Sequence, residues 1–95
     1  MALSATEQLL AFEQIKQLKA KYCRYIDTKR WELLGTLFAA DTVFDGFGSA
    51  PSGADVATFV AGVSKRLQPC ISVHHCHTPE ISLLSDTHAR GSWAM

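Results

Sequence analysis

The chain has 95 residues, 47% of them hydrophobic, and its nine basic and nine acidic residues give a formal net charge of zero. That length allows one domain, residues 1–95, with enough apolar residues for a core. A neutral chain lacks the positive charge excess by which most nucleic-acid-binding domains are recognised. No apolar run approaches the roughly 18 residues of a membrane span. We therefore predict neither nucleic acid nor a membrane as a partner.

The first predicted element is a long helix over residues 5–27. Ser4 and Glu7 have the spacing of a capping box, in which each side chain accepts from the other residue's backbone amide. No glycine or proline interrupts the run that follows, and its apolar residues recur with the helical period. These residues are Leu9, Phe12, Ile15, Leu18, Tyr22, Tyr25 and Ile26. We expect this stripe to face the core.

The middle of the chain is expected to alternate helix and strand. Apolar spacing predicts a short helix that begins at Trp31 and is ended by Ala40 and Asp41, and the β-forming residues 42–47 predict a strand. After a loop rich in glycine, serine and proline, Ser52 is expected to cap a third helix over residues 56–67, which Pro69 ends.

Two strands are expected at the end of the chain. The first covers residues 71–84, with a kink or bulge at Pro79, and the second covers residues 87–95. A turn at Ser85 and Asp86 would pair them antiparallel. The order helix, helix, strand, helix, strand, strand predicts an α+β fold, with helices on one face of a mainly antiparallel sheet. Because the apolar, strand-like run reaches Met95, we expect further strands beyond it.

Three of the four histidines lie in the first of these strands, at His74, His75 and His77, with Cys76 among them. Side chains of a strand alternate between its faces, so His74 and Cys76 share one face while His75 and His77 share the other. A metal site needs three or four ligands converging on one point. We therefore predict no metal site, and expect His75 and His77 to face outward.

His74, Tyr22 and Asp27 are the candidates for catalysis. Imidazole is a common proton-transfer group because its ordinary pKa lies near neutrality. Tyr22 lies on the apolar stripe, where it is either a core residue or a hydrogen-bond donor at a pocket. Asp27 lies at the helix end, about 140° around the helix from Tyr22. Spacing alone favours a turn residue there, whose carboxylate accepts from the amides of Thr28 or Lys29.

The three cysteines, Cys23, Cys70 and Cys76, are an odd number with no paired spacing. The N-terminus leads directly into a charged helix without the pattern of a signal peptide. We therefore expect reduced thiols and a cytoplasmic location.

Two blocks of sequence resemble the SnoaL-like proteins of the NTF2-like superfamily. Residues 14–27, followed by Lys29 and Trp31, look like their opening helix. His74 and residues 77–81 look like the first strand of their central hairpin. The returning strand is matched by Thr87, Ala89, Arg90, Gly91 and Trp93. The chain is most similar to the bile acid 7α-dehydratase type, with scytalone dehydratase and ketosteroid isomerase as more distant relatives by fold.

The resemblance implies a cone-shaped α+β barrel, in which a curved sheet wraps the long helix and encloses a pocket. In the dehydratase type, a strand histidine acts with a helix tyrosine and two aspartates, without a cofactor. The matching residues here are His74, Tyr22 and Asp27, and the second aspartate is expected beyond Met95. That carboxylate would orient the histidine, while Asp27 would orient or assist a leaving hydroxyl group.

The expected function is that of a lyase, a dehydratase acting on a small cyclic, partly apolar ketone or hydroxy compound. Two alternatives stay open: a non-catalytic module that binds small molecules, and an isomerase or cyclase on the same scaffold. We also expect a homo-oligomer formed through the outer sheet face that carries Val73, His75 and His77, since that face would otherwise expose apolar surface.

Overall fold

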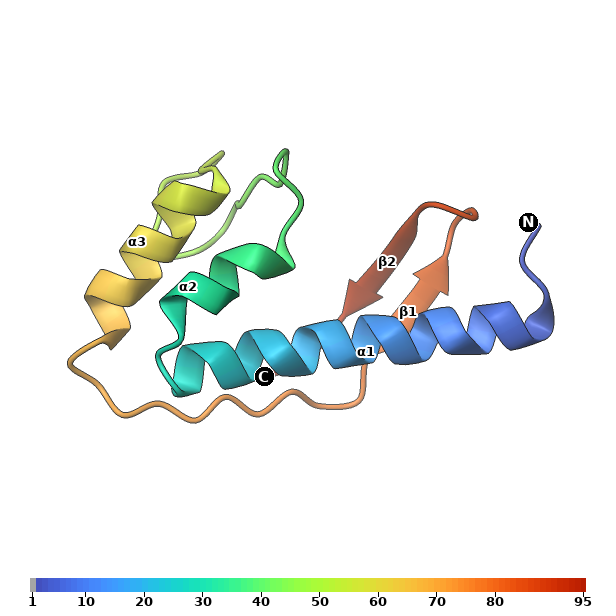
Figure 1. Cartoon of the computed structure of the whole chain (residues 1–95), viewed down its shortest axis with the longest axis horizontal. Coiled ribbons are helices and arrows are strands. Elements are labelled where there is room, and N and C mark those ends of the chain that lie inside the picture. The colour runs from blue at the N-terminus through green and yellow to red at the C-terminus, as the bar shows by residue number, and fades with distance from the viewer. Residues whose placement is uncertain (1) are drawn as a thin grey trace.

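The long helix α1 dominates the computed structural model, which describes residues 2–95; the other helices lie over one end of α1 and a small sheet lies beside it (Figure 1). The elements in chain order are α1 (Ala5–Asp27), α2 (Trp31–Leu34), the 3₁₀ helix η1 (Gly35–Leu37), α3 (Val56–Leu67), β1 (Glu80–Leu83) and β2 (Ala89–Ser92). The predicted α+β class is confirmed. None of the helices among these residues is both long and apolar enough to traverse a bilayer.

Both ends of α1 are fixed by local chemistry, and the helix has the predicted bounds. The Ser4 hydroxyl accepts from the Glu7 amide at 3.1 Å, and the Glu7 carboxylate accepts from the Ser4 amide at 3.0 Å. This reciprocal pair satisfies amides that have no partner within the helix. At the other end, Lys29 adopts a left-handed conformation with φ 59°, which turns the chain out of the helix.

The second helix is shorter than predicted and ends as a 3₁₀ helix. One α-helical turn, α2, is followed directly by η1, and Phe38 is already extended with φ −111° and ψ 143°. The helix therefore ends at Leu37, before the predicted end at Ala40 and Asp41.

The strand predicted over residues 42–47 is wrong. Only Phe44 pairs, in an isolated antiparallel bridge with Ala54. The carboxylate of Asp45 accepts from the Gly53 amide at 2.7 Å and from the Ser52 hydroxyl at 3.0 Å. These bonds close residues 44–54 into a compact loop, so the extended run ends after Phe44.

The predicted cap of the third helix is also wrong, although its bounds are right. Asp55, not Ser52, is the N-cap of α3, and its carboxylate accepts from the Thr58 amide at 2.8 Å. Asp55 directly precedes the first helical residue, which is the position from which a short side chain reaches the free amides. The helix ends at Leu67, as expected from Pro69.

The predicted hairpin is present but shorter than expected. β1 and β2 pair antiparallel, with Glu80 opposite Ser92 and Leu83 opposite Ala89. Residues 71–79 are extended but lie outside the sheet, and in this part only the His77 amide reaches the returning chain, at the Ala94 carbonyl, 2.8 Å away. Residues 70–79, here called the strap, instead run beside α1 (Figure 1).

The core lies at the C-terminal end of α1, between this helix, α2, α3 and the loop of residues 44–54. Aromatic rings fill it: Phe44 and Phe59 are stacked with centroids 4.0 Å apart, and Phe38 and Phe47 meet both of them edge-on. The buried residues of this cluster are Ile26, Leu34, Phe44, Ala54, Phe59 and Val63.

The predicted apolar stripe of α1 is therefore only partly covered. Its C-terminal end is in the core, whereas Leu9 and Leu18 are 68% and 47% exposed. The two strands among residues 2–95 do not curve around the helix, so these residues do not close the cone-shaped barrel that the resemblance implied.

Candidate active site

Asp27 and His74 meet where the strap crosses the end of α1. The His74 ring Nδ1 lies 2.6 Å from Asp27 Oδ1, and the His74 backbone amide donates to Asp27 Oδ2 at 2.7 Å. The Ser72 hydroxyl donates to Oδ1 at 2.8 Å. The His74 and Asp27 side chains are 26% and 22% exposed, so the pair is accessible but largely shielded from water. One carboxylate thus accepts three hydrogen bonds from the strap.

The strap reaches this place because α3 ends beside the turn that follows α1. The Lys29 ammonium group donates to the Gln68 carbonyl at 2.6 Å, and the Trp31 indole donates to the Gln68 side chain at 2.6 Å. The chain leaving α3 must therefore start its return along α1 close to Asp27.

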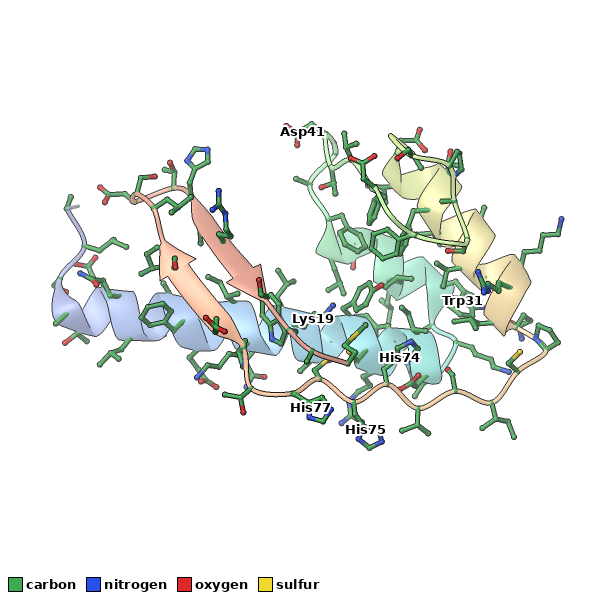
Figure 2. The ribbon with its side chains drawn as sticks, turned by 180° about the vertical axis from the view of Figure 1, so that it is seen from behind. Lys19, Trp31, Asp41, His74, His75 and His77 are labelled. Carbon is green, nitrogen blue, oxygen red and sulfur yellow. The ribbon has the colours of Figure 1, made fainter. Side chains whose placement is uncertain are left out.

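The predicted alternation of side chains is confirmed along the strap. Ser72, His74 and Cys76 face α1, whereas the His75 and His77 rings point away from it (Figure 2). The extended backbone alone produces this alternation, although the strap is not a strand of the sheet.

The turn role that spacing favoured for Asp27 is wrong. The amides of Thr28 and Lys29 donate to the carbonyls of Arg24 and Ile26, at 2.9 and 3.0 Å. The Asp27 carboxylate is therefore free to accept hydrogen bonds from the strap. Because these amides continue the helical bonding pattern for one more turn, the side chain is not needed to satisfy them.

The environment of Asp27 favours its ionised form. Burial alone would raise the pKa of this carboxyl, but the hydrogen bonds from the His74 amide, the His74 ring and the Ser72 hydroxyl outweigh it and hold the pKa below its ordinary value. An ionised carboxylate beside Nδ1 selects the imidazole tautomer that carries its proton on Nδ1. Nε2 of His74 is then the proton acceptor.

Tyr22 and His74 line one cavity of about 200 Å³ between α1, α3 and the loop of residues 44–54. Its walls are mostly apolar, with one cation at Arg66. Burial raises the pKa of Tyr22 to about 12, so its hydroxyl is protonated at neutral pH and can donate a hydrogen bond. The lining residues are Tyr22, Ile26, Phe47, Gly48, Ser49, Val63, Arg66, Leu67, His74 and Met95.

A second cavity, of about 250 Å³, lies on the other side of Tyr22. The Lys19 ammonium group lies over the Tyr22 ring, 4.3 Å from its centroid, and 5.8 Å from the Trp93 ring centroid. Aliphatic and aromatic side chains form almost all of the wall. These are Ile15, Leu18, Tyr22, Leu37, Phe38, Phe44, Phe47 and Trp93. The structure thus brings Tyr22 and His74 to one cavity, whereas Asp27 contacts His74 but is not among the residues that line this cavity.

Two features of this region were missed in the sequence. Ser72 shares a strap face with His74, so the alternation of side chains could have suggested its contact with Asp27. Cys23 and Cys76 lie with their sulfurs 2.6 Å apart, 53 positions apart in sequence, and no spacing pattern indicates that contact. Within residues 2–95, no three histidine, cysteine or acidic side chains are grouped as ligands for a metal ion.

A mostly apolar cavity with a histidine and a tyrosine in its wall has the features of a small-molecule site. The family model of the SnoaL-like domain matches residues 7–95. The chain belongs to this family, which is part of the NTF2-like superfamily and includes polyketide cyclases and dehydratases.

Proposed function

We propose that the chain is a dehydratase of the bile acid 7α-dehydratase type, which acts on a cyclic, partly apolar β-hydroxy ketone without a cofactor. The observation that carries this proposal is the hydrogen-bonded pair of Asp27 and His74 next to a cavity that Tyr22 also lines. An imidazole oriented by a carboxylate is a general base, and an apolar cavity suits a ring system.

The first step is removal of a proton from the carbon next to the ketone. Nε2 of His74 accepts this proton, while Asp27 keeps Nδ1 protonated and stabilises the imidazolium that forms. The electron pair of the broken C–H bond moves into the enolate. Asp27 is thus assigned to orienting the base, a role that the resemblance assigns to a carboxylate beyond Met95.

The second step expels the hydroxyl group at the β carbon. The Tyr22 hydroxyl donates a hydrogen bond to the enolate oxygen, and the negative charge that builds up there makes this bond stronger than in the ground state. As the enolate reverts to a ketone, the C–O bond at the β carbon breaks. The departing hydroxide takes the proton from His74, so the products are an unsaturated ketone and one water molecule.

A binding module is the second candidate, and the cavity of about 250 Å³ favours it. Its nearly continuous apolar wall would hold a hydrophobic ring without any reaction. An isomerase or a cyclase would use the same proton removal and differ in the fate of the enolate.

Proton removal can be measured without knowing the natural substrate. The full chain would be incubated in deuterated water with a panel of alkyl-substituted cyclic β-hydroxy ketones, and mass spectrometry would follow deuterium uptake and loss of water. We expect His74→Ala to slow deuterium uptake by ~100-fold or more, because the general base is lost. Tyr22→Phe should slow it as well, since the enolate loses a donor.

His75→Ala is the matched control, because it removes the same ring from the opposite face of the strap. It should leave deuterium uptake unchanged. Uptake without loss of water would indicate an isomerase or cyclase. Ketones that bind but return undeuterated would indicate a binding module, and equal rates in His74→Ala and the unmodified chain would refute the role of His74.

A further inference from the structure

Cys23 and Cys76 join α1 to the strap one turn before the catalytic pair. Their Sγ atoms are 2.6 Å apart, although the residues are 53 positions apart in the chain. Both are free thiols in this structure. A disulfide bond needs a sulfur separation of about 2.05 Å, so a shift of roughly half an ångström would bring these atoms to bonding distance.

The two thiols differ in their exposure. Cys76 is exposed on the strap, whereas Cys23, on α1, is buried. Burial and the hydrogen bond between the two thiols raise the pKa of Cys23 to about 12, so this thiol is rarely ionised at neutral pH. Since a thiolate is the attacking species, the exposed Cys76 is the first to react with a soluble oxidant.

The third cysteine is positioned differently. Cys70 lies at the start of the strap and its thiol meets the Arg66 carbonyl at 3.7 Å, so it does not share the contact between the other two. The contact is therefore specific to one pair, and Cys70 provides a matched control.

We propose that Cys23 and Cys76 are a modification site at which a low-molecular-weight disulfide, such as oxidised glutathione, installs a disulfide bond between α1 and the strap. The bond would pin the strap beside the position of His74. This proposal does not depend on the chemistry assigned to His74 and Tyr22.

The reaction is two thiol–disulfide exchanges. The Cys76 thiolate attacks one sulfur of oxidised glutathione, which breaks the small disulfide and releases one glutathione thiolate. Cys23 then loses its proton, its sulfur attacks Cys76 Sγ in the mixed disulfide, and the second glutathione leaves as a thiolate that takes up a proton. The protons of the two cysteine thiols end on the two glutathione molecules, and two electrons pass from the protein to the oxidant.

The test uses the full chain with oxidised glutathione as the only oxidant. After alkylation of free thiols, non-reducing digestion and mass spectrometry identify which cysteines are linked. We expect a linked pair of peptides carrying Cys23 and Cys76, in the unmodified chain and in Cys70→Ser alike. The link should be absent in Cys76→Ser, a change at an exposed position that leaves core packing intact.

Thermal unfolding gives an independent measurement. Closing a loop of 53 positions restricts the unfolded chain, so oxidation should raise Tm by about 10 °C or more, and a reducing agent should reverse the rise. Cys70→Ser should show the same rise. A disulfide through Cys70, a link between two chains, a stable glutathione adduct on Cys76 alone, or an unchanged Tm after oxidation would overturn the proposal.

Discussion

At the scale of single residues, the ionised carboxylate of Asp27 holds the candidate site together. It accepts three hydrogen bonds, all from the strap, while α1 supplies the carboxylate itself. Because these bonds exist only in the folded chain, they stabilise the ionised form there and lower the pKa of Asp27 relative to the unfolded chain. Such a group contributes stability above its unfolded pKa, and this contribution is lost as the pH falls through the folded pKa.

We therefore predict that Asp27→Asn destabilises the chain in a pH-dependent way. Near neutral pH the free energy of unfolding should fall by about 1–3 kcal/mol, because the charge-assisted bonds are lost. The difference between the two proteins should shrink as the pH falls below the ordinary pKa of an aspartate, about 3.9, and should be lost as the pH falls through the lower pKa of the folded chain. Urea unfolding at several pH values measures this difference in the free energy of unfolding.

Asp41→Asn is the control for this prediction, since Asp41 is exposed on the other side of the molecule (Figure 2). It should change the free energy of unfolding little at any pH. A constant difference between Asp27→Asn and the unmodified chain across that range would contradict the linkage.

Part of this site could be predicted from the alternation of side chains along the strap. Strand alternation correctly assigned His74 to the inner face and His75 and His77 to the outer face, because alternation is a local property of extended backbone. The partner of His74 could not be found in this way. Asp27 lies 47 positions earlier, and its local environment indicated a turn. Only the path of the chain between them brings the carboxylate and the imidazole together.

At the scale of elements, the loop of residues 44–54 is packed closely against α3. A methyl group added at Gly62 would overlap the backbone carbonyl of Ser49. Glycine at this helical position therefore lets the loop approach and complete the wall of the cavity shared by Tyr22 and His74.

We predict that Gly62→Ala lowers the free energy of unfolding by about 1–3 kcal/mol, because either the loop or the helix must move. Gly35→Ala is the matched control: its methyl group would lie 3.8 Å from the Val60 side chain, an ordinary contact. Thermal or urea unfolding of both variants measures the effect. Equal stability of the two would show that the loop adjusts without cost.

The helices could be predicted from sequence better than the strands. Capping residues and apolar spacing are local signals, and they gave α1 and α3 their correct bounds. A strand also needs a neighbouring strand. Residues 42–47 and 71–79 have the composition of strands. Hydrogen bonds to the Asp45 and Asp27 carboxylates hold these two segments outside the sheet.

At the scale of the whole molecule, the chain is elongated. Its Cα radius of gyration is 14.6 Å and its extents are 45, 25 and 21 Å. A compact chain of this length would have a radius of gyration of about 12 Å. The excess comes from α1, whose 23 residues extend well past the core.

We predict that the outer side of the strap mediates self-association. Ile71 and Val73 are 98% and 71% exposed there, beside the outward rings of His75 and His77. Isolated apolar side chains are common on surfaces, but Ile71 and Val73 share one face of the strap with the two histidine rings. Light scattering at micromolar concentration should show a homo-oligomer, and Val73→Asp should shift it toward the monomer.

Val43→Asp is the matched control, because Val43 is 61% exposed but lies in a different region of the chain. It should leave the oligomer intact. A monodisperse monomer for the unmodified chain would contradict this prediction.

The attachment of the strap has a consequence for the temperature range of activity. Side-chain bonds, rather than a ladder of backbone bonds, hold it against α1. A segment attached in this way has a lower free energy of local unfolding than the aromatic core. On warming, the strap should detach first and carry the imidazole away from its carboxylate. The proposed activity would then decline several degrees below global melting, while the helical signal of the chain is still complete.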